Sequence, residues 1–264
     1  GDVYKRQVYD KPMIYYPLSV LMLAGIKEIL IITDEFSNNL YQKLLGDGSK
    51  LGIQIFYKIQ NKPRGLAESF IIGEDFINDD DVCLILGDNI FFGHGLVDLL
   101  SSAISKADKL NYASIFAYHV PDPERYGVVE FKDKIPISIE EKPKNPKSNY
   151  AIVGLYFYPN CVIKKSKLVE FSPRKELEIS SLNLMYLQEK KLNVDCVEIH
   201  TGKLANYVKS HKNFSSELSR IKKSSKLASK LDIEVHAGHG LDYKTTKILT
   251  KIKEIEEFNI GHFI

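Results

Sequence analysis

Short runs of large aliphatic residues alternate with helix-like stretches along residues 8–195, and this alternation restricts the fold more than any other feature. Residues 28–33 hold four consecutive aliphatic side chains and lead into turn residues, a pattern typical of a buried strand. We predict such strands at residues 28–33, 53–59, 82–88 and 114–120, with helices at 17–24 and 65–76. The alternation predicts an α/β fold with a mostly parallel sheet and helices on both of its faces.

Two further groups of strands follow along the chain. The first group, at residues 127–131, 137–140 and 153–158, is predicted to form an antiparallel extension. The second group comes after residue 195, with strands at 196–201, 233–237 and 258–264 and helices at 214–231 and 245–255.

The composition excludes several classes of partner. The chain has 36 Lys and Arg against 34 Asp and Glu, which argues against a protein built to bind nucleic acid or an anionic membrane. No apolar run approaches the ~20 residues that span a bilayer, and no secretory leader is visible. Cys83, Cys161 and Cys196 are too widely spaced for a disulfide framework or a Cys-rich metal site. We therefore expect a cytoplasmic protein that acts on small molecules.

The two ends of the chain are unusual. Residues 1–7 begin with Gly1 and carry no periodicity into the residues that follow, so we interpret them as a non-native segment. The chain stops at Ile264 within an apolar run, without a cap or a tail. We therefore interpret the chain as a fragment at both ends.

The first residues that carry chemistry lie at the end of the third predicted strand, in the run LGDN at residues 86–89. Ligands of open α/β sheets bind beyond the carboxyl ends of the strands. Asp88 could therefore hold Mg²⁺ against a polyphosphate, since hard oxygen ligands suit that ion, while Asn89 could hydrogen-bond a sugar. The alternative is that Asp88 caps a helix, and the run alone does not decide between the two.

Several longer motifs surround this run. They are VYDKPMIYYPLS at 8–19, LGDGS at 45–49, GLA at 65–67, LGDNIF at 86–91, DPERYGVVEF at 122–131, EEKP at 140–143 and KSNYA at 147–151. Together they resemble the glucose-1-phosphate thymidylyltransferase family of sugar nucleotidylyltransferases over residues 8–195. The resemblance implies a Rossmann-like nucleotidyltransferase sheet and a homo-oligomer.

The resemblance also implies a reaction and a set of site residues. The family joins glucose 1-phosphate to dTTP with loss of pyrophosphate, a step of carbohydrate biosynthesis, and relies on positioning and on charge stabilisation by Mg²⁺, Lys and Arg. By motif, Asp88 would bind Mg²⁺, Gln60 and Gly65 would bind thymine, and Lys142 would neutralise the sugar phosphate. The residues that would line the sugar site are Asn89, Tyr126, Gly127, Glu141 and Ile152.

Each of these residues also has a purely structural interpretation. The alternatives are a polar residue at a strand edge for Gln60, turn glycines for Gly65 and Gly127, a solvated charge pair for Glu141 and Lys142, and core packing for Tyr126 and Ile152.

The sequence also departs from the family pattern. It contains no G-x-G-T-R-L loop, no Lys following such a loop and no W-L-D-T-G-T run, so groups that cradle a triphosphate and a second metal ligand are not found. One donor to a developing oxyanion can be worth ~3 kcal/mol. We therefore expect little or no turnover by this chain, and two inner sheet edges left unpaired where the family has a central strand.

A second set of motifs lies near the end of the chain. EIHTG at 198–202, AGHGL at 237–241 and NIGH at 259–262 each close a predicted strand, where (β/α)₈ barrels place catalytic and phosphate-binding groups. They resemble pyridoxine 5′-phosphate synthase over residues 193–264. The resemblance implies that Glu198 stabilises the transition state, that His239 donates a proton, and that phosphate is bound by Gly240, Gly261 and His262. A metal site is disfavoured because these histidines lack helical ligand spacing.

We therefore interpret the chain as a composite. An incomplete nucleotidyltransferase domain at residues 8–195 is followed by a partial (β/α)₈-barrel segment at 196–264, and three strands cannot close an eight-stranded barrel. Three functions remain open: a truncated thymidylyltransferase, a piece of pyridoxine 5′-phosphate synthase, and a non-catalytic nucleotide-sugar binder that keeps Gln60, Gly65 and Asp88.

Overall fold

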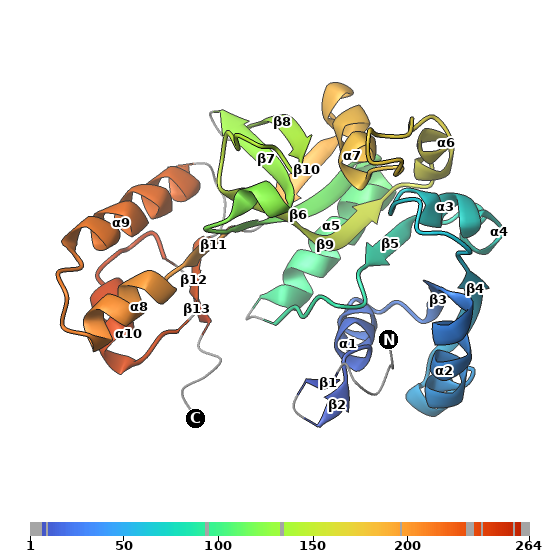
Figure 1. Cartoon of the computed structure of the whole chain (residues 1–264), viewed down its shortest axis with the longest axis horizontal. Coiled ribbons are helices and arrows are strands. Elements are labelled where there is room, and N and C mark those ends of the chain that lie inside the picture. The colour runs from blue at the N-terminus through green and yellow to red at the C-terminus, as the bar shows by residue number, and fades with distance from the viewer. Residues whose placement is uncertain are drawn as a thin grey trace. The chain divides into compact units, whose positions relative to one another are not determined.

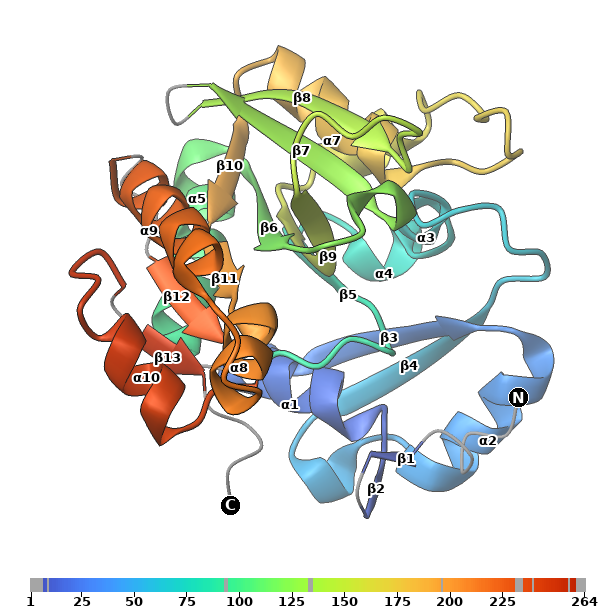
Figure 2. The same cartoon turned by 60° about the vertical axis from the view of Figure 1, so that its left-hand side comes forward.

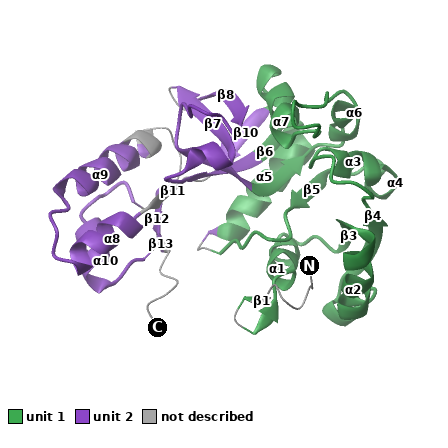
Figure 3. Ribbon diagram, in the orientation of Figure 1, with its two compact units in different colours: residues 1–92, 96–114, 154–191 green, residues 93–95, 115–153, 192–264 purple. Residues whose placement is uncertain are grey.

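The chain forms two compact units in the computed structural model, coloured separately in Figure 3. Unit 1 comprises residues 1–92, 96–114 and 154–191, and unit 2 comprises residues 93–95, 115–153 and 192–264. The structure describes residues 7–8, 10–92, 95–132, 135–195, 197–230, 235–238, 240–255 and 257–259. The units interleave along the sequence, and the predicted division at residues 195–196 stays a prediction.

Unit 1 begins with a short hairpin and a helix and continues as alternating strands and helices. Its elements are β1 (Gln7–Val8), β2 (Lys11–Pro12), α1 (Tyr15–Leu23), β3 (Glu28–Thr33), α2 (Glu35–Leu45), β4 (Gln54–Ile59), α3 (Glu68–Ile72), α4 (Glu74–Ile77), β5 (Val82–Ile85), α5 (Leu96–Leu110), α6 (Val162–Ser166), α7 (Ile179–Gln188) and the second half of β9 (Tyr150–Tyr158). Strands β3 and β4 pair in parallel, and α2 lies along them (Figure 2). The strand predicted at residues 28–33 is confirmed.

The apolar core of unit 1 joins α1 and β3 to β5. Leu21, Ile29 and Ile31 are buried together, and Cys83 and Ile85 of β5 pack against them. Full burial of one such aliphatic side chain stabilises the fold by roughly 1.5–3 kcal/mol. Within the described residues, β3 pairs only with β4 and β5 pairs only with β9. Side-chain packing connects β3 and β5 in this core, and the two unpaired inner edges expected from the sequence stay a prediction.

Two local differences from the predicted elements affect the candidate site. The helix predicted at residues 65–76 is replaced by α3 and α4, because Gly65 has a φ of +99° and Gly73 separates the two helices. The strand predicted at 82–88 ends at Ile85, and β5 runs antiparallel to β9. The α/β class is confirmed, but the mostly parallel sheet predicted from the alternation is wrong for β5, because the alternation does not encode which strands become neighbours.

Unit 2 contains an antiparallel hairpin and its neighbouring strands. These are most of β6 (Ala113–His119), β7 (Gly127–Lys132), β8 (Ile135–Glu141), the first half of β9 and β10 (Leu192–Asp195), in the spatial order β10-β6-β9-β7-β8. Strand β7 runs antiparallel to both β8 and β9. The antiparallel extension predicted for this part of the chain is confirmed.

The last part of unit 2 is a parallel three-stranded sheet surrounded by helices (Figure 1). Its elements are β11 (Val197–His200), α8 (Gly202–Lys209), α9 (Ser215–Lys230), β12 (Val235–Gly238), α10 (Tyr243–Leu249) and β13 (Glu257–Asn259). Leu204, Ile221, Val235 and Leu249 are fully buried in its core. Parallel strands joined through helices are the unit from which a (β/α) barrel is built, as the sequence pattern predicts.

Among the helices that the structure describes, none has both the length and the apolar character that crossing a membrane requires.

Asp242 is the N-cap residue of α10, and its substitution tests how this helix is stabilised at its first turn. Its side chain accepts a hydrogen bond from the backbone N–H of Thr245 at 2.8 Å, and this bond is the main reason that the pKa of Asp242 lies below its ordinary value. The Asp242→Ala variant should lose about 1 kcal/mol of unfolding free energy at neutral pH. A lowered folded pKa stabilises the fold above the unfolded pKa near 3.9, and this contribution is lost as the pH falls through the folded value.

Urea unfolding of the wild type and the variant at neutral and strongly acidic pH measures this difference. The difference should shrink in acid, and Asp79→Ala, at an exposed carboxylate, should change the unfolding free energy little at either pH. A difference of equal size at both pH values would contradict the capping role.

Candidate functional site

The turn after β5 holds the predicted metal ligand. Asp88 is exposed and lies three residues beyond Ile85, the last residue of β5. Asn89 donates a hydrogen bond from Nδ2 to Oδ1 of Asp88 at 3.0 Å, and its own Oδ1 accepts one from the backbone N–H of Gly154 at 3.0 Å. Because α5 begins only at Leu96, the alternative that Asp88 caps this helix is wrong. The structure leaves a solvent-facing carboxylate whose orientation is set by Asn89.

Strand β9 fixes the position of this turn. The backbone N–H of Leu86 donates to the carbonyl oxygen of Gly154 at 2.9 Å. A Cβ atom on Gly154 would lie only 2.5 Å from Cγ of Leu86, so the two segments approach this closely because residue 154 lacks a side chain. Gly154 is not among the residues predicted from the sequence, and an isolated glycine inside a strand pattern is the signal that could have indicated it.

Gln60 is held at the end of β4 by its backbone and by its side chain. Its backbone N–H donates to the carbonyl oxygen of Thr33 at 2.9 Å, and its Nε2 donates to Oε2 of Glu68 at 2.6 Å. The other carboxylate oxygen of Glu68 receives Nε of Arg64 at 2.9 Å. Glu68 is buried, with 7% of its surface exposed, while Gln60 is half-buried. Arg64 and Glu68 were also missed, although their spacing of four residues is typical of an ion pair.

Gly65 lies against the backbone of Leu177. The backbone N–H of Leu177 donates to the carbonyl oxygen of Arg64 at 2.6 Å, and the N–H of Ala67 donates to the carbonyl oxygen of Leu177 at 3.1 Å. A Cβ atom on Gly65 would be 2.4 Å from that same carbonyl oxygen. Glycine is therefore required at position 65 for a structural reason, in line with the alternative interpretation of Gly65 as a turn glycine.

The β7–β8 hairpin of unit 2 carries another group of predicted residues. Gly127 pairs with Glu141, and just beyond this pair the backbone N–H of Lys142 donates to the carbonyl oxygen of Tyr126 at 2.9 Å. Lys142 is exposed and has a φ of +43°, while the Tyr126 side chain is partly exposed beneath the Arg125 guanidinium. The end of the hairpin therefore joins two exposed residues, Tyr126 and Lys142, through their backbones.

The predicted residues are divided between the two units. Unit 1 contains Gln60, Gly65, Asp88 and Asn89, and unit 2 contains Tyr126, Gly127, Glu141, Lys142 and Ile152. Ile152 is buried, with 7% of its surface exposed, as the core-packing alternative requires.

Of the second set of predicted residues, the structure describes the backbone of Glu198 within β11 and Gly240 just after β12. The backbone of Glu198 pairs with that of His236, and both N–H and Oγ1 of Thr201 donate to the carbonyl oxygen of Gly238, at 2.8 and 2.6 Å. Gly240, with a φ of +69°, passes over the start of α8. The loops after β11 and β12 therefore meet. The side chain of Glu198 and all of His239, Gly261 and His262 lie outside the described residues.

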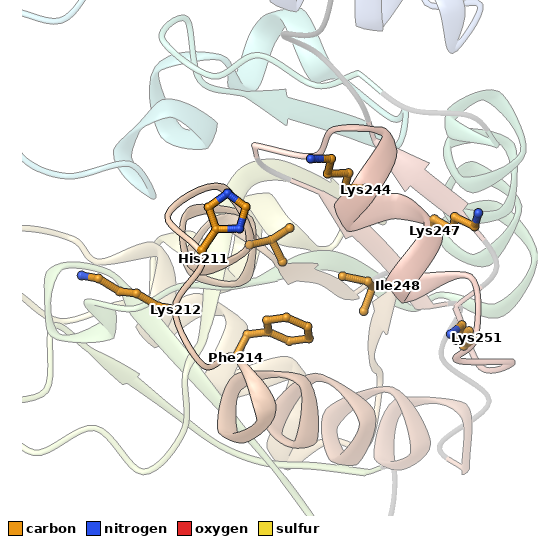
Figure 4. A pocket seen from close by; sticks show the side chains of 8 residues that line it. His211, Lys212, Phe214, Lys244, Lys247, Ile248 and Lys251 are labelled. Atoms are coloured by element: carbon orange, nitrogen blue, oxygen red, sulfur yellow. The ribbon is translucent and has the colours of Figure 1, made fainter.

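A separate pocket of about 510 Å³ lies beside α8 and α10 (Figure 4). Basic and apolar side chains line it, namely Val208, His211, Lys212, Phe214, Lys244, Lys247, Ile248 and Lys251. None of the residues predicted from sequence contributes to its lining.

In the part of the chain that the structure describes, no three His, Cys, Asp or Glu side chains gather as a ready-made metal site.

Comparisons with known proteins match two family models. The model described as "Nucleotidyl transferase" matches residues 2–217, and the model described as "Pyridoxal phosphate biosynthesis protein PdxJ" matches residues 176–264. The first covers most of the chain and the second covers about its last third.

Curated relatives support the first match. A glucose-1-phosphate thymidylyltransferase of Neisseria meningitidis is 55% identical over 188 residues, which are 71% of this chain and 64% of the relative. Relatives from Neisseria gonorrhoeae and Xanthomonas campestris give similar values, so the chain spans slightly less than two thirds of their length. One from Mycolicibacterium smegmatis is 40% identical over 261 residues, covering 97% of this chain and 88% of the relative.

Solved structures agree with this fold. A Bacillus anthracis protein assigned as a glucose-1-phosphate thymidylyltransferase, crystallised with sucrose, is 35% identical and superposes with a TM-score of 0.65 over 72% of this chain and 75% of its own. A UDP-glucose pyrophosphorylase solved with UDP-glucose, at 21% identity and a TM-score of 0.60 over 71% of this chain and 79% of its own, shares the fold.

Replacement of Gly65 by alanine tests the close contact with Leu177. The variant should lose more than about 2 kcal/mol of unfolding free energy, because alanine is strained at positive φ and its methyl group would collide with the Leu177 backbone. Gly87→Ala is the matched control, since a Cβ there meets nothing closer than 3.9 Å, and its effect should stay within about 0.5 kcal/mol. Equal losses in the two variants, measured by chemical denaturation, would contradict the account of Gly65.

Proposed function

Because this chain belongs to the nucleotidyl transferase family, we propose that it carries the nucleotide-binding and sugar-binding part of a sugar-1-phosphate nucleotidylyltransferase that uses dTTP and glucose 1-phosphate. The observation that carries the proposal is the exposed Asp88 carboxylate, oriented by Asn89 at the carboxyl end of β5. Ligands of α/β sheets bind at this end of the strands. The names of the curated relatives support thymidylyl transfer as the specific reaction.

In the proposed reaction, an oxygen of the sugar phosphate attacks the α-phosphorus of dTTP. The bond between the α-phosphorus and the bridging oxygen breaks, and pyrophosphate leaves. In unit 1, Gln60 and the backbone of Gly65 bind the base. In unit 2, Lys142 supplies positive charge to the sugar phosphate, and Tyr126 and Glu141 contact the sugar. Asn89 in unit 1 and Gly127 in unit 2 are further sugar-site residues by the same family resemblance.

The Asp88 carboxylate fits a role in holding Mg²⁺. Mg²⁺ prefers oxygen ligands and is commonly held by one or two carboxylates together with substrate phosphates and water. Only one hydrogen bond, from Asn89, is made to this exposed carboxylate among the contacts that the structure gives. When bound, the metal would neutralise charge on the phosphate oxygens. The chain's own contribution is to hold Asp88 through Asn89 and Gly154.

The Asp88→Asn variant tests this assignment. Isothermal titration with dTDP-glucose, with and without Mg²⁺, should show that the metal-dependent gain in affinity falls about tenfold or more in the variant. Asp79→Asn removes a carboxylate from an exposed loop outside the site and should retain the full gain. An Asp88→Asn variant that responds to Mg²⁺ like the wild type would contradict the role of Asp88.

Turnover separates binding from catalysis. The printed sequence contains no G-x-G-T-R-L loop, whose backbone N–H groups would cradle the phosphates. We expect the chain to bind dTDP-glucose but to show no detectable pyrophosphorolysis of it. A robust release of dTTP from dTDP-glucose and pyrophosphate would overturn this expectation.

A second candidate function concerns residues 196–264. The match to the PdxJ model and the parallel order β11-β12-β13 favour a segment derived from pyridoxine 5′-phosphate synthase, in which Glu198, His239, Gly240, Gly261 and His262 would have served. Titration with 1-deoxyxylulose 5-phosphate distinguishes the two functions, since binding of this sugar phosphate in preference to dTDP-glucose would favour the second.

A further inference from the structure

Glu68 is a buried carboxylate that the proposed reaction does not use. It begins α3, and only 7% of its surface is exposed. Burial of a carboxylate is costly unless it is paired and hydrogen-bonded. Both of its oxygens have partners, since Oε1 receives Nε of Arg64 at 2.9 Å and Oε2 receives Nε2 of Gln60 at 2.6 Å. The fold therefore keeps a buried carboxylate here that forms an ion pair with Arg64 and a hydrogen bond with Gln60.

This contact determines which way the Gln60 amide points. Both oxygens of the Glu68 carboxylate act as acceptors, one towards Nε of Arg64 and the other towards Gln60. The atom of Gln60 that faces Glu68 must then be the donor Nε2, and the reverse orientation would bring two acceptors together. The Gln60 backbone is also fixed, through its N–H to the carbonyl oxygen of Thr33. The carbonyl oxygen Oε1 is consequently the acceptor that Gln60 offers to a ligand, beside the second N–H of Nε2.

We propose that Glu68 is a positioning residue that makes Gln60 a fixed hydrogen-bond acceptor, so that the site selects a base that presents a ring N–H, as thymine and uracil do, over cytosine. This inference rests on the proposed function, in which Gln60 contacts the base. A free glutamine can present either its oxygen or its amino group and therefore suits both kinds of base edge. When the amide is fixed, Oε1 of Gln60 faces the ring nitrogen of the base. In cytosine this ring nitrogen is itself an acceptor, so no hydrogen bond forms between the two.

The full chain is tested with the Glu68→Gln variant, which keeps the size of the side chain but can also donate. The affinities for dTTP and dCTP, measured by titration calorimetry with Mg²⁺, give the preference for thymine. The wild type should prefer dTTP, and this preference should fall about tenfold or more in Glu68→Gln. Glu35→Gln is the matched control, because Glu35 also lies in the first turn of a helix but is exposed, and it should keep the wild-type preference.

A measurement without ligand separates this inference from the proposed function. In the free wild type, NMR should show a scalar coupling across the hydrogen bond from Nε2 of Gln60 to the carboxylate carbon of Glu68, and slow exchange of that amide proton. A wild type without this coupling overturns the inference. A wild type that has the coupling but binds neither nucleotide contradicts the proposed function and leaves the positioning role of Glu68 supported.

The Gln60→Glu, Glu68→Gln double variant gives a chemical rescue. Residue 60 is then a carboxylate, which can only accept, and residue 68 can donate to it. The preference for dTTP should return towards the wild-type value, an outcome that a merely structural role of Glu68 does not produce. Unchanged preference in Glu68→Gln, with the thermal stability retained, would overturn the inference.

Discussion

Residue 65 has no room for a side chain, and the close contact that this allows determines where Arg64 and Glu68 lie. With glycine there, the backbone of residues 64–67 bonds to Leu177 on both of its polar groups. Helix α3 can then begin at Glu68, whose carboxylate meets Arg64 and Gln60. A bulkier residue at position 65 would move the start of α3 and with it the group that orients Gln60.

The turn that carries Asp88 follows the same principle. Gly154 lets β9 come close to Leu86, and its backbone N–H then holds Asn89, which in turn orients Asp88. In both places a glycine permits close approach of two segments. A neighbouring polar side chain, Asn89 or Glu68, then forms a hydrogen bond with a predicted site residue, Asp88 or Gln60. Both arrangements rest on contacts between residues of unit 1 alone or of strand β9.

The sequence predicted the elements whose signals are local, and it missed contacts between distant residues. The strand at 28–33 and the helices and strands near the end of the chain follow from short apolar runs and turn residues. Asp88 was identified from its place after a strand, although the strand ends at Ile85. Glu68 could not be linked to Gln60 from sequence, because the start of α3 at Glu68 rather than at Gly65 depends on Leu177, more than a hundred residues later. The antiparallel pairing of β5 with β9 was missed for the same reason.

The central claim is that the Asp88 turn of unit 1 binds a metal together with a thymidine nucleotide. Amide NMR of the full chain with dTDP-glucose and Mn²⁺ in place of Mg²⁺ tests it most directly, since the paramagnetic ion broadens the signals of nearby nuclei. The account predicts broadening of the Asp88, Asn89 and Gly154 amide signals that requires the nucleotide and disappears on competition with Mg²⁺. Sharp signals at these residues, with broadening confined to residues 196–264, would contradict it.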